Sequence, residues 1–192
     1  MNSNLAYKLE LTEEIIGGQV MMLAAPSSNH NRVSTRICSI FDHYLDGRPC
    51  EPFGDHEAVY LEEDQEEYQP DMMVVCDPEK VRGKGVFGAP DLVVEVLSAS
   101  TARYDRGHKK DVYERHGVRE YWIVDPEGQN VEQYLLQDGR FVLRDVYHRY
   151  SVSELEDMKE KERAEVVTEF PCGIFPDLTI SLDRIFRRVQ RY

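Results

Sequence analysis

The apolar side chains of residues 27–46 recur at the spacing of a helix that buries one face. They are Val33, Ile37, Ile40, Phe41, Tyr44 and Leu45. Ser27 or Ser28 can cap the start of this helix, and Gly47 stands where a helix commonly ends. We therefore predict a long amphipathic helix near the beginning of the chain.

On both sides of this helix the pattern changes to short strands. Residues 5–24 have the pattern of two strands joined by a turn at Gly17-Gly18. Residues 57–61 form another short apolar run typical of a strand. The acidic residues 62–67 that follow predict a solvated loop.

Two further apolar runs, residues 72–76 and 92–97, each follow a Pro-Asp pair. The pairs are Pro70-Asp71 and Pro90-Asp91. A basic, glycine-rich segment between the two runs predicts a hairpin. The second run, LVVEVL, places one charge inside a β-branched apolar stretch, which is typical of a central strand covered on both faces.

The second half of the chain continues with alternating helix and strand patterns. Residues 103–117 predict a helix that ends at Gly117, and residues 120–125 predict a strand. A further hairpin is predicted around Asp138-Gly139, with strands at 131–136 and 141–147.

The last segment adds a charged helix and a short tail. Ser151 and Glu154 have the spacing of a capping box that opens a helix to about residue 165. The tail predicts a strand or turn and a final short helix. The order helix, strand, strand, strand, helix, strand predicts an α/β fold with a central mixed β-sheet, flanking helices and extra hairpins at both ends. We expect residues 1–192 to form a single domain.

Composition narrows the function classes. The net charge of −13, from 23 basic and 36 acidic residues, argues against a protein that coats nucleic acid by charge alone. Residues 80–119 are different, because nine Lys and Arg outnumber five acids there and give a local charge of +4. This window is either part of a patchwork surface or a basic rim around one site for an anionic substrate.

No apolar stretch approaches the ~20 residues of a membrane-spanning helix, and the N-terminal residues lack the pattern of a secretory signal. We therefore expect a cytoplasmic protein without membrane contact. The four scattered cysteines are expected to be reduced thiols and not a zinc site or a disulfide frame.

Glu95 is the first candidate for chemistry, because a carboxylate inside a buried strand is costly unless it is paired or binds a metal. It could equally lie at a solvated strand end or pair with an arginine. Asp71 begins the preceding strand, and side chains on adjacent strands ~4.8 Å apart can share one cation if the register allows. Asp91 lies about 13 Å from Glu95 along the same strand, so it is expected at a strand entry or turn.

The helix after the Glu95 strand offers a positive charge. Asp105 and Lys109 are one helical turn apart and share a face. The alternative for this pair is an ordinary surface salt bridge worth a few tenths of a kcal/mol. Tyr113 continues the same face and is expected to serve core packing.

The chain resembles the Uma two family in three segments: PDMMVV, APDLVVEVLSAST and DRGHKKDVYERHGVREYWIVDPEGQNVEQY. Its members are described as endonucleases of the PD-(D/E)XK, restriction-endonuclease-like superfamily. The resemblance runs from about residue 14 to about residue 186. It implies a core of a helix, three strands, a helix and a strand around a mixed sheet.

The resemblance also implies a site. Asp71 matches the first acidic position of the motif and Glu95 the second. The usual lysine lies two residues after the second acid, where this chain has Leu97, so the resemblance implies a lysine moved to the following helix, at Lys109. Two more recurrent family positions match Asp105 and His30. For His30 the alternative is a structural hydrogen bond at the start of its helix.

The mechanism that the resemblance implies is metal-assisted hydrolysis of a phosphodiester. Asp71, Glu95 and the backbone carbonyl of Val96 would hold Mg²⁺ or Mn²⁺, because oxygen-only ligands suit a hard cation. The metal would polarise the phosphate and lower the pKa of a bound water. Lys109 would orient that water or neutralise charge on the phosphate.

Three functions stay open at this point. The first is a metal-dependent endonuclease acting on nucleic acid, with DNA as the expected substrate. The second is a catalytically inactive nuclease fold used as a binding or assembly module, which the acidic composition favours. The third is a protein that acts with a partner supplying the DNA-binding surface. A homodimer is plausible for each of them.

Overall fold

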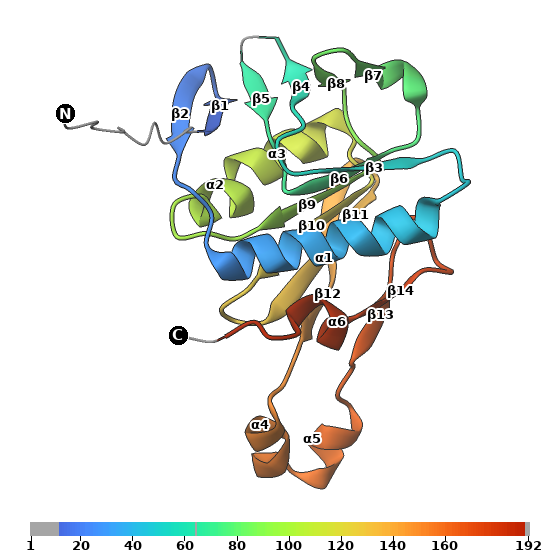
Figure 1. Ribbon diagram of the computed structural model, residues 1–192. Helices are drawn as coiled ribbons and strands as arrows, with labels where there is room; N and C mark the ends of the chain where they lie inside the picture. Colours follow the sequence, from blue (N-terminus) through green and yellow to red (C-terminus); the bar gives the residue numbers. More distant parts are fainter. Residues whose placement is uncertain (1–11, 64, 191–192) are drawn as a thin grey trace, which may run out of the picture.

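The computed structural model describes residues 12–63 and 65–190 and builds them around a mixed six-stranded sheet (Figure 1). The strand order is β12-β11-β10-β9-β6-β3, and only the pair β9–β10 is parallel. The strands are β3 (Glu51–Gly54), β6 (Met72–Val75), β9 (Leu92–Val96), β10 (Glu120–Asp125), β11 (Asn130–Gln137) and β12 (Arg140–His148).

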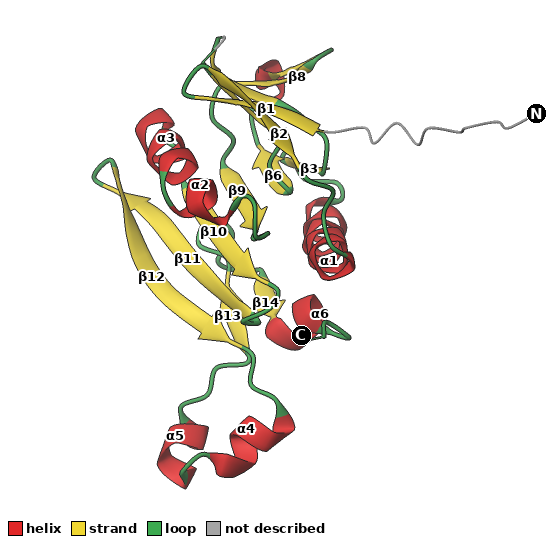
Figure 2. Cartoon of the chain, turned by 90° about the vertical axis from the view of Figure 1, so that its left-hand side faces the viewer, coloured by secondary structure: helices red, strands yellow, loops and turns green. Residues whose placement is uncertain are grey.

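A second sheet of six short strands has the order β2-β1-β5-β4-β8-β7. Its strands are β1 (Thr12–Ile16), β2 (Gln19–Leu23), β4 (Val59–Glu62), β5 (Glu66–Tyr68), β7 (Val81–Arg82) and β8 (Gly85–Phe87), with the short 3-10 helix η1 (Pro78–Lys80) before β7. In Figure 2 this sheet stands at the top of the molecule, on the side of α3 (His108–His116).

The central sheet has a hydrophobic core on each face. α1 (Ser28–Leu45) covers one face with Val33, Ile37 and Phe41, against Val94 and Trp122 of the sheet. On the other face lie α2 (Ala102–Arg106), α3 and the second sheet, which share a separate core. Because side chains alternate along a strand, Leu92, Val94 and Val96 face α1, whereas Val93 and Glu95 face α3.

The predicted helix over 27–46 is confirmed as α1. The Ser27 side chain accepts a hydrogen bond from the His30 backbone N–H at 3.2 Å, which satisfies a donor that the first turn leaves unpaired. The hairpin turn at Gly17-Gly18 is also confirmed, with φ angles of 58° and 73° that favour glycine, while residues 5–11 of the predicted first strand lie outside the described residues. Only residues 24–27 connect β2 of this hairpin to α1.

The other fold predictions are confirmed in outline, but the strand predictions are wrong in two places. The run 57–61 belongs to the second sheet, and the strand that pairs with β6 is β3, which contains Pro52 and Gly54. Pro and Gly weaken the strand signal but are tolerated at a sheet edge, where β3 lies. The acidic segment 62–67 contributes to strand β5, so it is only partly a loop.

Two predicted helices are interrupted. The helix over 103–117 is divided at Gly107 into α2 and α3. The charged helix after the Ser151 capping box consists of α4 (Val152–Asp157) and α5 (Glu160–Ala164), and the capping box itself is confirmed. Figures 1 and 2 show α4 and α5 standing away from the rest of the chain.

The chain then returns to pack on α1. β13 (Glu169–Pro171) and β14 (Thr179–Ser181) form a small antiparallel pair, and α6 (Leu182–Phe186) contacts α1. Among the helices described, none is long and apolar enough to cross a membrane.

The expectation of reduced thiols is wrong for one pair, since the structure joins Cys50 and Cys76 by a disulfide. β3 and β6 pair with Glu51 opposite Val75, which brings the two neighbouring cysteines opposite each other. The spacing of the cysteines could not reveal this pairing, because it depends on the register of two strands. Cys38 and Cys172 are free thiols.

Candidate functional site

The strand register brings Asp71 and Glu95 together. β6 and β9 are antiparallel with Met72 opposite Val94, so the next position places Asp71 opposite Glu95. Asp71 Oδ2 accepts a hydrogen bond from the Val96 backbone N–H at 2.6 Å. In a strand the N–H and C=O of one residue point to the same side, so the Val96 carbonyl also faces the Asp71 side.

His30 of α1 meets Asp71 from the other side. Its Nε2 atom lies 3.1 Å from Asp71 Oδ1, and both side chains are largely buried. Burial alone would lower the pKa of His30, but the hydrogen bond and the charge of Asp71 raise it above its ordinary value. Ser34, one turn later, donates to the Asp71 backbone carbonyl at 3.2 Å. Thus α1 holds Asp71 at two points.

Glu95 is buried and receives two donors on one oxygen. Tyr113 Oη lies 3.0 Å and Lys109 Nζ 3.3 Å from Glu95 Oε1. Burial raises the pKa of Glu95 well above its ordinary value, and Lys109 only partly opposes this. The expectation that Tyr113 only packs in the core is therefore incomplete, because its hydroxyl also contacts the candidate site.

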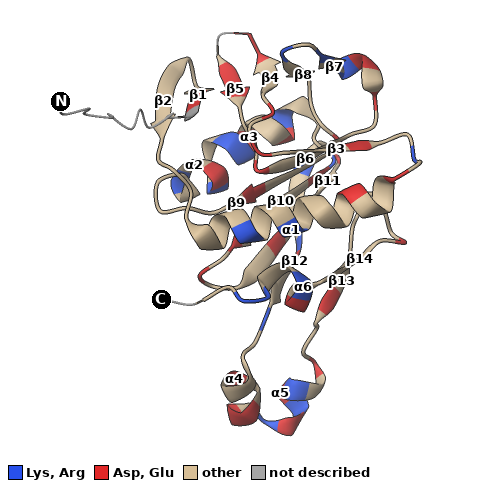
Figure 3. Cartoon of the chain, in the orientation of Figure 1, with Lys and Arg blue, Asp and Glu red and all other residues tan. Residues whose placement is uncertain are grey.

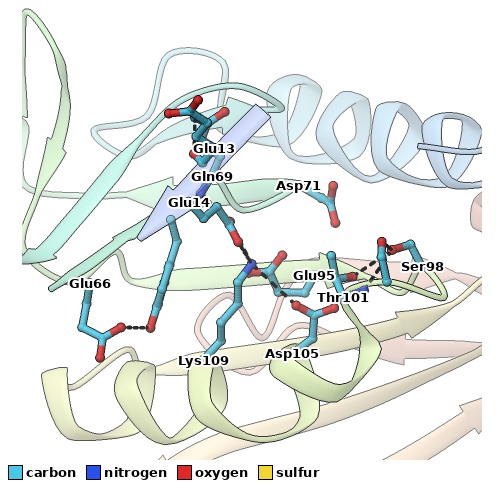
Figure 4. Close-up of polar contacts among 12 residues, drawn as sticks. Glu13, Glu14, Glu66, Gln69, Asp71, Glu95, Ser98, Thr101, Asp105 and Lys109 are labelled. Carbon is cyan, nitrogen blue, oxygen red and sulfur yellow. Dashed lines mark hydrogen bonds and ion pairs between the residues drawn. The ribbon is translucent and has the colours of Figure 1, made fainter. Parts of the chain in front are cut away.

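Lys109 lies at the centre of the cluster in Figure 4. Its Nζ atom is 2.8 Å from Glu14, 3.3 Å from Glu95 and 3.6 Å from Asp105, and its side chain is only 2% exposed. Burial alone would lower the pKa of Lys109, but the three carboxylates raise it well above its ordinary value. The ammonium group is therefore a fixed positive charge inside the protein.

Asp105 and Lys109 form the predicted pair, but not on the surface. The Asp105 side chain is 1% exposed, so the surface salt-bridge alternative is wrong. Neither carboxylate oxygen of Asp105 receives a hydrogen bond of normal geometry from the part of the chain that the structure describes. Burial raises the pKa of Asp105, with Lys109 acting in the opposite direction.

Glu14 of β1 is the residue that the sequence interpretation missed. It is 1% exposed, and besides contacting Lys109 it accepts the Gln69 backbone N–H at 2.8 Å. A signal was present, because strand alternation puts Glu14 on the same face as the buried Ile16. Its partner could not be read from the sequence, since Lys109 follows 95 residues later.

The cluster carries an excess of negative charge around a cavity of about 70 Å³. The four acids Glu14, Asp71, Glu95 and Asp105 surround one lysine and the His30 ring. Such an excess in a buried place calls for a cation or for protons. The oxygen-only donor set of Asp71, Glu95 and the Val96 carbonyl suits a hard divalent cation.

Side chains alone do not complete a metal site. Within residues 12–63 and 65–190, no three His, Cys, Asp or Glu side chains are arranged to hold a metal ion. The predicted set has two side chains and one carbonyl, so waters and substrate oxygens would supply the other ligands, as is usual for Mg²⁺. The residues present therefore fit a partly hydrated cation.

Four of the nine basic residues in the window 80–119 form ion pairs with acids, among them Lys109 in the cluster. Arg106 lies 2.8 Å from Glu132, and Arg115 lies 3.7 Å from Glu62. Asp91 serves a structural role, as expected, because it accepts the Cys76 backbone N–H at 2.8 Å. The choice between a patchwork surface and a basic rim stays open.

The chain is similar to several known proteins. The model of the Uma2 family, described as "Putative restriction endonuclease", matches residues 5–168. An uncharacterized protein of Synechocystis sp., slr1290, is 32% identical over 136 residues, which are 71% of this chain and 65% of that protein. Another from Synechocystis sp., sll1609, is 27% identical over 150 residues, which are 76% of this chain and 85% of that protein.

A solved structure agrees with the fold. The crystal structure of "a putative nuclease belonging to DUF820" from Anabaena variabilis has a TM-score of 0.68 and 18% identity, and the match covers 92% of this chain and 90% of that one. The central mixed sheet with flanking helices is accordingly a restriction-endonuclease-like core. With the family model matching most of its length, this chain belongs to the Uma2 family.

Proposed function

We propose that this chain is a metal-dependent endonuclease that hydrolyses nucleic-acid phosphodiesters, with DNA as the expected substrate. One observation carries the proposal: Asp71, just before β6, lies opposite Glu95 of β9 and accepts the Val96 N–H, and Lys109 lies against Glu95. The match to a family described as restriction endonucleases supports the same activity.

The proposed roles follow from the contacts of each side chain. Asp71, Glu95 and the Val96 carbonyl would hold Mg²⁺ or Mn²⁺, and the bound ion would polarise a phosphate oxygen and acidify a water. His30 and the Val96 N–H fix the Asp71 carboxylate in place, so His30 is a positioning residue.

Lys109 would supply the positive charge that the usual lysine of the motif supplies. Its Nζ atom already contacts Glu95, so it stands beside the proposed metal ligand. From there it would orient the attacking water or offset charge that builds on the phosphate. Asp105, at the end of α2, holds Lys109 of α3 across the break at Gly107.

A thermal-shift titration with Mg²⁺ and Mn²⁺ tests the proposed site. A cation that binds the folded chain raises its melting temperature, and Glu95→Gln should abolish this rise because it removes a charged ligand while keeping the shape of the side chain. Glu13→Gln is the matched control. It removes the same charge from an exposed position on β1.

Cleavage of DNA completes the test. Wild type and Glu13→Gln should cut a labelled DNA substrate in the presence of Mg²⁺ or Mn²⁺, and Glu95→Gln should not. If wild type shows neither a metal-dependent rise nor cleavage at millimolar metal, the inactive nuclease fold becomes the better description. The acidic composition would then favour a role in binding or assembly.

A further inference from the structure

Arginines on two neighbouring elements form a positive surface on this acidic chain. Arg32 and Arg36 lie on α1, and Arg187 and Arg188 directly follow α6. We call these four residues the arginine patch. Arg32 Nη1 donates to the Arg188 carbonyl at 3.3 Å, and Arg36 Nη1 donates to the Ile185 carbonyl at 3.0 Å, so the patch is one continuous surface.

The arginine patch differs in its ion pairing from several other arginines of the chain. In residues 12–63 and 65–190, no member of the patch forms an ion pair with a carboxylate. Other arginines of the chain do form such pairs, for example Arg119 with Asp91 and Arg140 with Glu114. Burial lowers the pKa of Arg36, and the like charges of its neighbours lower it further.

Arg188 occupies a position where the backbone favours glycine. It has a φ of 59°, in the left-handed region, just past the end of α6. Glycine is the usual residue at this point after a helix, because it has no Cβ to strain the left-handed conformation. The fold by itself therefore does not explain an exposed arginine here.

The arginine patch starts on the helix that contacts Asp71, but on its other side. Arg32 lies about 3 Å along the axis of α1 from His30, and the helix turns by about 200° between them, so Arg32 faces α6 while His30 faces Asp71. In Figure 3, α1 and α6 lie side by side, and each carries both basic and acidic positions. A strand of nucleic acid carries a phosphate charge every few ångströms and can span both places.

We propose that the arginine patch binds the phosphate backbone of the nucleic acid that the candidate site hydrolyses, an inference that rests on the proposed function. Guanidinium groups match phosphate oxygens in geometry and charge, and they hold a backbone without reading its sequence. On a chain with a net charge of −13, a basic surface without ion pairs orients the substrate, because the chain as a whole repels it.

The salt dependence of DNA binding tests this inference. The probe is a fluorescein-labelled DNA duplex of about 20 base pairs, two helical turns, with the single strand of the same sequence as a second probe. Binding is followed by anisotropy without divalent metal, between about 50 and about 200 mM salt. The variant Arg187→Ser with Arg188→Gly removes two charges and spares the Arg32 and Arg36 contacts that fasten α1 to α6.

The double variant should weaken binding on the order of tenfold or more and reduce the slope of log affinity against log salt by about 1.8. The matched control is Lys84→Ser with Lys161→Ser, which removes two exposed charges from the β7–β8 turn and from α5. The control should bind as wild type does. Equal losses in both variants, or no binding of either probe by wild type, would overturn the inference.

A second assay tests the proposed function independently of the arginine patch. Hydrolysis of a small phosphodiester, bis(p-nitrophenyl) phosphate, involves the candidate site without the arginine patch, and it is compared between wild type and Glu95→Gln. Metal-dependent hydrolysis that Glu95→Gln abolishes supports the proposed function even if the patch variant binds DNA normally. Loss of DNA binding in the patch variant supports the patch even if wild type hydrolyses nothing.

Discussion

Asp71 and Asp91 occupy matching positions at opposite ends of the β6–β9 pair. Each follows a proline, and each carboxylate accepts a backbone N–H of the partner strand, from Val96 at 2.6 Å and from Cys76 at 2.8 Å. Only Asp71 belongs to the carboxylate cluster, whereas Asp91 lies 3.3 Å from Arg119. A comparison of Asp71 with Asp91 therefore distinguishes what such an aspartate does for the fold from what it does at the candidate site.

We expect Asp71→Asn and Asp91→Asn to lower the free energy of unfolding by similar amounts, about 1–3 kcal/mol, because each weakens a charge-assisted bond to a strand N–H. Urea unfolding without metal measures this. With millimolar Mg²⁺ or Mn²⁺ the variants should differ, since only Asp71→Asn loses the metal-dependent gain in stability. An equal metal response in the two variants would place the cation elsewhere.

The carboxylates around Lys109 lead to a second prediction. Lys109→Met should lower the free energy of unfolding by about 3–5 kcal/mol, because it leaves Glu14, Glu95 and Asp105 buried without their counter-charge. Adding Glu14→Gln to this variant should recover part of the loss, since one fewer buried charge is uncompensated. A double-mutant cycle by urea unfolding measures the coupling, and strictly additive losses would contradict it.

The contacts of Glu66 on β5 lead to a prediction about how the stability of the folded chain depends on pH. Burial alone would raise its pKa, but hydrogen bonds from Tyr68, the Gly17 N–H and His108 bring it below the ordinary value. A carboxylate with a lowered folded pKa stabilises the fold above its unfolded pKa of about 4.3, and this contribution is lost as pH falls through the folded pKa. Wild type should therefore lose stability more steeply in acid than Glu66→Gln.

Unfolding in urea between neutral pH and about pH 3 tests this. Glu67→Gln, on the next residue of the same strand, is the control, because alternation points its side chain to the other face. It should retain the acid sensitivity of wild type. Parallel pH profiles for wild type and Glu66→Gln would contradict the prediction.

Much of the fold followed from local patterns. The helix α1, the hairpins and the central strand β9 have strong periodic signals, and turn glycines mark their limits. The assignment of strands to two sheets did not follow, because β3 and β4 are both short and only long-range pairing decides which of them joins β6. The disulfide of Cys50 and Cys76 depends on the same pairing.

The candidate site was predictable in part. A charge inside an apolar strand indicated Glu95, and the resemblance to a family indicated Asp71, Lys109 and His30. The contact of Lys109 with Glu14 was not predictable, because it joins α3 to β1 of the second sheet through tertiary packing alone. Neither was the burial of Asp105, since a pair one turn apart on a helix looks the same in sequence whether it faces water or the core.

A second buried acid, Glu120, is expected to stabilise the fold without taking part in the candidate site. Its carboxylate accepts Trp122 Nε1 and Gln133 Nε2, both at 2.6 Å, and the backbone N–H groups of Gly173 and Ile174 at 3.0 and 2.8 Å. No lysine or arginine pairs with it in the described part of the chain, so hydrogen bonds alone hold the charge. It thereby fastens the segment before β14 to the central sheet.

We expect Glu120→Gln to lower the free energy of unfolding by about 2–3 kcal/mol, because an amide presents N–H groups where the site already supplies donors. Urea unfolding measures the loss. The control is Glu132→Gln on the adjacent β11, whose partly exposed pair with Arg106 should contribute about 0–1 kcal/mol. The metal-dependent rise in melting temperature should persist in Glu120→Gln, because Glu120 shares no contact with the cluster around Lys109. Its disappearance would mean that the two buried carboxylate sites are coupled through β10.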